Sequence, residues 1–173
     1  MPTTTAQISP AEYAAFYVPY VANVPTDQPL AEALRDSQRR LDAWLDAQSP
    51  DRAGYRYAPG KWTVAQCVQH LLDAERVFAY RLLRIARGDA TPLPGFDQDA
   101  YAEAAGERLG LPRLRAELGL VRRSTVALVD GLGDDALART GTASGKPVSA
   151  RAIAAITAGH TLHHLRVFEE RYG

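Results

Sequence analysis

The sequence has little of several features that would mark particular classes of protein. Its 173 residues include one cysteine, which excludes an intramolecular disulfide and makes a reducing compartment the default expectation. Twenty basic and twenty acidic residues give zero net charge, whereas nucleic-acid binders that rely on bulk charge carry a basic surplus. No run of 18 apolar residues occurs, and the first ten residues lack the regions of a secretory signal. We therefore expect a cytoplasmic protein that binds neither nucleic acid nor a membrane.

The length of the chain predicts one domain spanning residues 1–173, because domains usually contain about 100–200 residues. Apolar residues make up 46% of the sequence and charged residues 23%, as in ordinary globular proteins. A domain of this size buries about 70% of the surface that its unfolded chain exposes. It therefore needs no disulfide or structural metal to form a core.

Four long segments carry apolar residues at three- and four-residue steps, which is the pattern of amphipathic α-helices. The second segment begins at a capping box formed by Thr63 and Gln66 and ends at Gly88. The predicted helices cover residues 30–48, 63–88, 111–132 and 149–172. Because no helix of this kind can bury its apolar face alone, the sequence predicts an all-α protein built as a four-helix bundle.

A short helix is also predicted near the N-terminus. Ser9 and Glu12 have the spacing of a capping box, with a proline at the first helical position, and the helix would end at Pro19. Three aromatic residues of this helix either pack on the bundle, which we favour, or form a homodimer contact; they are Tyr13, Phe16 and Tyr17.

Two long connections join the predicted bundle helices. Residues 89–110 include a short helical turn near residues 100–105, and a connection of this length is often functional. It could also be a crossover that only returns the chain along the bundle, and we favour this alternative. Residues 133–148 are rich in Gly, Ser and Thr and are predicted to form a loop that leads to Ser149 as a helix cap.

The four histidines lie on two of the predicted helices. His70 is on the second, and His160, His163 and His164 are on the fourth. His160 and His164 are four residues apart, so their side chains project from one helix face, and His70 lies beside the apolar stripe of its helix. Three imidazoles with one open position are typical of catalytic zinc-type sites. The pattern indicates a shared metal site, and the alternative is that these histidines are hydrogen-bonded core or surface residues.

Several neighbouring residues are further candidates for the chemistry. His163 is rotated away from the His160/His164 pair and could support a ligand, pack between helices or reach substrate. Glu75 interrupts an apolar row and could be a general base, an anchor for a ligand or, as we favour, the buried partner of Arg81 or another arginine. Cys67 could be a fourth ligand, although free cysteine is usually a small buried apolar residue. The HExxH motif of zinc peptidases is absent, because position 161 is threonine.

Short motifs along the chain occur in an order and spacing that a known family shares. They are YAPGKW at 57–62, HLLDAER at 70–76, PGFD at 94–97 and GHTLHH at 159–164. In these motifs, and over nearly its whole length, the chain resembles the DinB/YfiT-like metalloenzymes. The resemblance implies a four-helix bundle in which His70, His160 and His164 bind one divalent metal ion, with water or substrate completing the coordination. Imidazole ligands suit several metals, of which we expect zinc or nickel.

The resemblance implies a small-molecule substrate and leaves two kinds of chemistry open. The first is a transferase in which the metal activates a low-molecular-weight thiol for attack on an electrophile, with Arg81 and Arg84 as candidates to hold acidic groups of the thiol. The second is a hydrolase that uses water activated by the metal, with Glu75 as the candidate base. A third reading is a non-catalytic protein whose metal is structural or absent. We rank the thiol transferase first.

Overall fold

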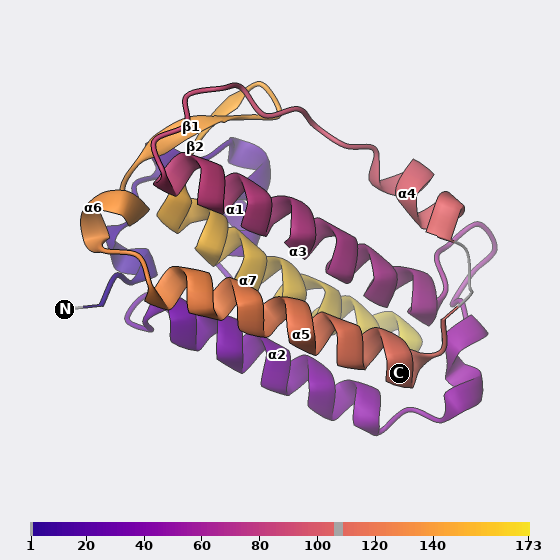
Figure 1. Ribbon diagram of the computed structural model, residues 1–173. Coiled ribbons are helices and arrows are strands. Elements are labelled where there is room, and N and C mark those ends of the chain that lie inside the picture. Colours follow the sequence, from indigo (N-terminus) through magenta and orange to yellow (C-terminus); the bar gives the residue numbers. More distant parts are fainter. Residues whose placement is uncertain (1, 106–108) are drawn as a thin grey trace.

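Four long helices form the body of the protein in the computed structural model, which describes residues 2–105 and 109–173 (Figure 1). They are α2 (Leu30–Asp46), α3 (Val64–Ala86), α5 (Leu111–Asp130) and α7 (Ala150–Val167), and α7 continues into a π-helical turn at Phe168–Tyr172. The predicted four-helix bundle is therefore confirmed. The capping boxes at Ser9 and Thr63 and the cap at Ser149 are also present. No helix of the described residues is both long enough and apolar enough to cross a membrane.

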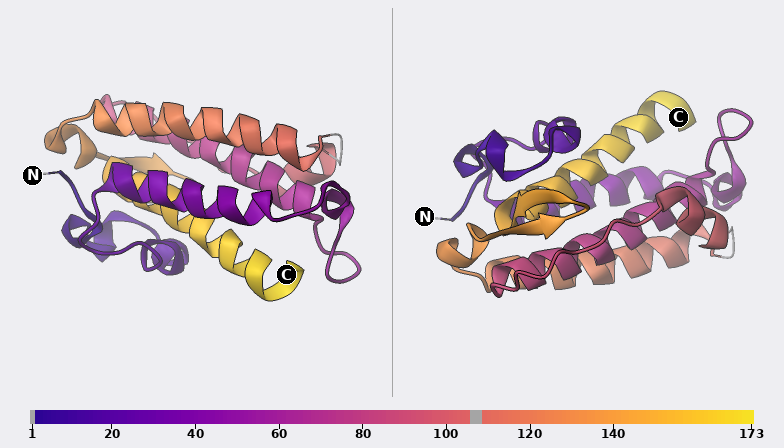
Figure 2. Two further views of the ribbon diagram at one scale, coloured as in Figure 1. Left: turned by 90° about the horizontal axis from the view of Figure 1, so that it is seen from below. Right: turned by 90° about the horizontal axis from the view of Figure 1, so that it is seen from above.

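The four helices are arranged so that α5 and α7 each pack against both α2 and α3. Helices α2 and α3, which follow one another in sequence, therefore lie at opposite corners of the bundle. The connection between α3 and α5 runs back along α3, so that these two helices are parallel (Figures 1 and 2). It contains α4 (Gln98–Ala105), which packs on α3. This connection is the crossover that the sequence favoured; its residues 106–108 lie outside the described part of the chain.

The buried core consists of two apolar clusters with a polar layer between them. In α3, residues up to Leu72 belong to one cluster and residues from Ala74 onward to the other, and each of the other three helices divides in the same way. Buried polar side chains occupy the boundary in every helix: Ser37 of α2, Glu75 of α3, Arg122 of α5, and His160 and Thr161 of α7. Each helix of the bundle thus brings polar groups to the same level of the core.

A β-hairpin covers one end of the bundle, where the sequence predicted only a loop. Strands β1 (Thr140–Ala143) and β2 (Lys146–Ser149) pair antiparallel, and Ser144 and Gly145 form the turn with φ of 52° and 73°. Two left-handed residues are typical of the tight hairpin turns that match the twist of the strands. The prediction was wrong because the strands are four residues long and rich in small residues, so they lack a clear alternation. A helical turn, α6 (Asp134–Leu137), precedes the hairpin.

The N-terminal segment differs from the predicted helix. Three short 3-10 turns lead into α1 (Val18–Val21), and Pro19 lies in the first turn of this helix instead of ending it. The first turn tolerates proline because its N–H groups have no partner within the helix. Tyr13 and Tyr17 pack against the core, as favoured, whereas Phe16 is 71% exposed. The 3-10 turns are Thr5–Gln7, Pro10–Glu12 and Ala15–Tyr17.

Candidate metal centre

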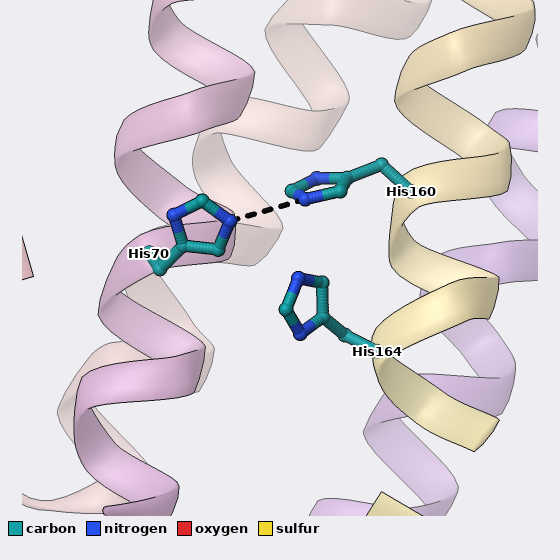
Figure 3. Close-up of side chains that lie close together, drawn as sticks. All are labelled: His70, His160 and His164. Atoms are coloured by element: carbon teal, nitrogen blue, oxygen red, sulfur yellow. Dashed lines mark hydrogen bonds between the residues drawn. The ribbon is translucent and has the colours of Figure 1, made fainter. Parts of the chain in front are cut away.

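Three imidazole rings meet between α3 and α7 (Figure 3). His70 comes from α3, and His160 and His164 lie one turn apart on the facing side of α7. Each ring offers one nitrogen such that the three nitrogens lie within 4.8 Å of one another. Nε2 of His70 is 3.1 Å from Nε2 of His160. The structure thus brings together the three histidines that the sequence singled out as metal ligands.

Aromatic side chains hold two of these rings in place. The indole of Trp62, just before α3, lies 4.9 Å from the His70 ring between centroids. Tyr20 of α1 lies 5.2 Å from the His160 ring on one side, and Phe78 of α3 lies 5.9 Å from it on another. Sequence reasoning did not identify Tyr20, because its segment carries no motif and meets α7 only in the folded protein.

Burial keeps these imidazoles neutral. Loss of hydration lowers the pKa of His70 to about 4, against a small opposite effect of the Asp99 charge. Burial, with contributions from His70 and His163, lowers the pKa of His164 to about 3. For His160, burial and the neighbouring histidines hold the pKa well below its ordinary value. A histidine must be neutral to coordinate a metal, so all three are in the binding form at neutral pH.

The donor set fits a divalent cation. Nδ1 of His164 is buried and has no hydrogen-bond partner within residues 2–105 and 109–173. A buried polar atom of this kind is costly unless something binds it. Imidazole nitrogens are ligands that zinc, nickel, copper and iron all accept, so the set identifies a class of metal and not one element.

A pocket of about 230 Å³ opens beside His70 and His160. Its walls come from α1 and the 3-10 turn before it, from α3 and the connection that follows α3, from the hairpin turn and from α7. They are mostly aromatic, and they include the buried residue Arg81. No acidic residue of the described chain lines the pocket. Asp99, whose charge reaches His70, is itself exposed at the start of α4.

Glu75 is held in a buried ion pair. Both of its carboxylate oxygens accept hydrogen bonds from Arg122, each at 2.8 Å, and both side chains are about 2% exposed. The remaining donors of Arg122 reach the carbonyl of Leu34, Ser37 Oγ and Thr161 Oγ1, so that all five of its N–H groups are used. Of the three roles that the sequence left open for Glu75, this arrangement corresponds to pairing with a buried arginine, which is Arg122 and not Arg81.

Arg122 was not identified from the sequence, although its position carried a signal. It follows Leu118 and precedes Val126 by four residues each, so it lies on the buried stripe of α5. A charge at such a position predicts a buried partner. Arg122 also contacts Thr161, the residue after His160, and thereby fixes α7 next to the histidines.

His163 and Cys67 lie outside the three-histidine cluster. The ring of His163 is half-buried against Tyr20, and burial lowers its pKa. Its Nδ1 has no hydrogen-bond partner among the described residues. Cys67 Sγ lies 3.5 Å from the hydroxyl of Tyr172, and burial raises the pKa of this thiol. The thiol is thus placed as a small buried side chain beside Tyr172.

Comparison with known proteins gives a family and several related folds. The family model described as the DinB superfamily matches residues 33–168. No match is found among curated proteins. YfiT from Bacillus subtilis, described as a probable metal-dependent hydrolase with an unusual four-helix bundle topology, superposes with a TM-score of 0.73 at 19% identity, covering 82% of each chain.

Two further solved structures share this fold. A mycothiol-dependent maleylpyruvate isomerase is 19% identical with a TM-score of 0.67; the match covers 81% of the present chain but 60% of the isomerase. The colibactin self-resistance protein ClbS, solved in complex with double-stranded DNA, is 17% identical with a TM-score of 0.61, covering 82% and 94% of the two chains. At these identities the similarity concerns the fold.

Proposed function

Because the chain belongs to the DinB superfamily, we propose that it is a metal-dependent transferase that joins a low-molecular-weight thiol to an electrophilic small molecule. His70, His160 and His164 would hold the metal. The chemistry that such a centre supplies is activation of the thiol, whose pKa falls so that it is a thiolate at neutral pH.

The observation that carries this proposal is the absence of a carboxylate from the pocket walls within the described residues. Hydrolysis by metal-activated water is commonly assisted by a nearby base, and the candidate base, Glu75, is occupied by Arg122. A thiol bound at the metal needs no such base. The protein's own contribution would be to orient the histidines, through Trp62 and Tyr20, and to exclude water with the aromatic walls.

A hydrolase is the second candidate, since YfiT is described as a probable metal-dependent hydrolase. The requirement for a thiol separates the two reactions. A small-molecule substrate and a cytoplasmic location belong to the same proposal, with zinc or nickel as the expected metal. The expectation that the chain does not bind nucleic acid stays a prediction, because one related fold is a complex with DNA. A homodimer likewise stays a prediction, which size-exclusion chromatography with light scattering would test.

The proposal is tested with protein loaded separately with zinc and with nickel. Each form is incubated with a panel of intracellular thiols and an aryl halide or epoxide, and product is measured by mass spectrometry. We expect turnover that requires both metal and thiol. Turnover of esters or amides without thiol would support the hydrolase, and no turnover above the His160→Ala protein with any thiol would remove the proposal.

Metal binding itself is measured by calorimetry. We expect His160→Ala to weaken binding by more than about 100-fold, since loss of even an outer hydrogen-bond partner of a metal ligand costs about 10–100-fold. His163→Ala is the matched control on the same helix and should retain metal. Equal metal affinity in the two variants would contradict the assignment of ligands.

A further inference from the structure

We propose that Arg81 makes the pocket beside the three histidines a binding site for a small-molecule carboxylate. Arg81 is 4% exposed and lines the pocket, and its guanidinium contacts Ser144 and lies 5.9 Å from the ring of Phe96, two further lining residues. The reaction in which the bound acid takes part is the one proposed above, so this inference names the substrate class of that reaction. Binding of the acid itself rests only on the pocket.

The guanidinium of Arg81 has unused hydrogen-bonding capacity. Nη2 donates to the carbonyl of Pro94 at 2.6 Å and to Ser144 Oγ at 3.0 Å. Nε and Nη1 make no hydrogen bond to any described residue, and no described carboxylate lies within ion-pair distance of Arg81. A buried arginine normally has a carboxylate partner, because an isolated buried charge is costly. The missing partner is therefore to be sought in a ligand.

The other arginines of this region are already paired. Arg122, equally buried, binds both oxygens of Glu75. Arg84, three residues after Arg81, forms an ion pair with Asp89 and donates to the hydroxyl of Tyr80, away from the pocket. The sequence offered Arg81 and Arg84 as alternatives for holding an acidic group, and the contacts favour Arg81.

The surroundings of Arg81 also suit an anion. A second cavity adjoins the pocket and shares Tyr17, Phe78 and Arg81 with it, and the exposed Lys146 of the hairpin lines that cavity. No acidic residue of the described chain lines either one. Two cations without a carboxylate give a positive potential, and a planar guanidinium fork binds a carboxylate with two parallel hydrogen bonds.

The position of Arg81 sets how the acid would lie. His70, Ala74, Phe78 and Arg81 follow one face of α3, and all four line the pocket. A carboxylate on Arg81 places the rest of the molecule past the ring of Phe78, toward His160, which lies 5.9 Å from that ring. The pocket is smaller than the roughly 300–1,000 Å³ of sites for drug-sized ligands, so a small acid fits best.

The test measures binding to chelator-treated, metal-free protein, which prevents the acid from binding a metal instead. Phenylacetate and its neutral methyl ester serve as a matched pair of probes, followed by NMR titration. We expect the wild type to bind the acid more tightly than the ester. Arg81→Met should weaken acid binding by about 10–100-fold, the value of hydrogen bonds to a charged group, and leave ester binding unchanged. Arg84→Met is the control and should bind the acid as the wild type does.

Equal affinity of the wild type for acid and ester, or equal acid affinity of wild type and Arg81→Met, would overturn the proposal. Arg81 also holds the loop at Pro94, so thermal unfolding of each variant is recorded first. If Arg81→Met does not fold, Arg81→Lys and Lys146→Met take its place. Both variants should bind the acid several-fold more weakly than the wild type and bind the ester with unchanged affinity. Wild-type affinity for the acid in both variants would also overturn the proposal.

The carboxylate could belong to the thiol or to the electrophile, and metal-loaded protein distinguishes them. Pairs of thiols and of electrophiles, each with and without a carboxylate, are compared in wild type and Arg81→Met. One of the two reactants, the thiol or the electrophile, binds Arg81 through its carboxylate. The KM for that reactant should be higher in Arg81→Met than in the wild type, and only when the reactant carries its carboxylate. Acid binding that depends on Arg81, without turnover of any pair, would keep this site and reject the transferase.

Discussion

At the scale of single residues, the pair of Glu75 and Arg122 dominates the interior. Removal of one partner leaves a buried charge without compensation. We expect Arg122→Met to lower the free energy of unfolding by about 3–5 kcal/mol, measured by urea denaturation. Replacement of both residues, as in Glu75→Leu with Arg122→Met, should restore much of this loss, because no unpaired charge remains.

A further substitution, Glu75→Gln, separates the structural role of Glu75 from a catalytic one. Under conditions where Glu75→Gln is fully folded, we expect its turnover of the thiol reaction to stay within a few-fold of wild type. A large loss of kcat in folded Glu75→Gln, with unchanged KM, would instead place this carboxylate in the reaction.

At the scale of elements, the contact between α1 and α7 depends on Gly159. A Cβ atom built on this residue would lie 1.9 Å from the carbonyl oxygen of Tyr20. We therefore expect Gly159→Ala to push α1 away and to destabilise the protein by about 1–3 kcal/mol or more in urea denaturation. Because Tyr20 lies against His160, metal affinity should fall as well.

Gly54 provides the matched control for this substitution. A Cβ atom at Gly54 would meet nothing within 4 Å. Gly54→Ala should therefore leave both the unfolding free energy and metal affinity close to wild type. Equal unfolding free energies and metal affinities for the two alanine variants would show that α1 can move away from α7 without destabilising the protein, and would contradict this prediction.

The N-terminal segment is fastened to the start of α7 by Glu12. Burial alone would raise the pKa of Glu12, but hydrogen bonds from Arg151 and Ser149 outweigh this and lower it from 4.5 to about 2. A lowered folded pKa means that Glu12 stabilises the protein fully above pH 4.5, and that this contribution is lost as the pH falls toward 2.

We therefore expect Glu12→Gln to cost about 1–3 kcal/mol of unfolding free energy at pH 7, the value of hydrogen bonds to a charged group. The difference in unfolding free energy between wild type and variant should shrink as the pH is lowered from 4.5 to 2. Denaturant unfolding at each pH measures this difference. The exposed Glu103→Gln serves as control. A difference that stays constant over this range would contradict the assigned role.

The sequence predicted the bundle from helical periodicity, and it grouped the three histidines from periodicity together with the resemblance to the DinB/YfiT-like family. Apolar stripes define the long helices, and a spacing of four residues places His160 and His164 on one face. The sequence did not predict the hairpin, because its short strands show no alternation of apolar and polar residues. It also did not predict the position of Tyr20, because this position depends on contacts with α7, which is distant in sequence. Arg122 shows an intermediate case, since its place on a buried stripe was visible but its partner was not.

At the scale of the whole molecule, the two apolar clusters make the bundle self-sufficient. Removal of metal should therefore leave a cooperatively folded, helical protein, as measured by circular dichroism. Metal at 100 times its Kd stabilises a protein by about 2.7 kcal/mol, which for a domain of this size corresponds to a rise in Tm of about 5–10 °C. Loss of helical signal after chelation would instead identify the metal as structural.

The order of the helices along the chain has a consequence for maturation. Two of the three imidazoles lie on α7, which follows the other three long helices in sequence. While the ribosome is still making the earlier helices, the growing polypeptide therefore has only His70 of the three. An ion held by all three rings could be captured only after α7 has left the exit tunnel and docked, so that acquisition of the proposed metal would come after assembly of the bundle.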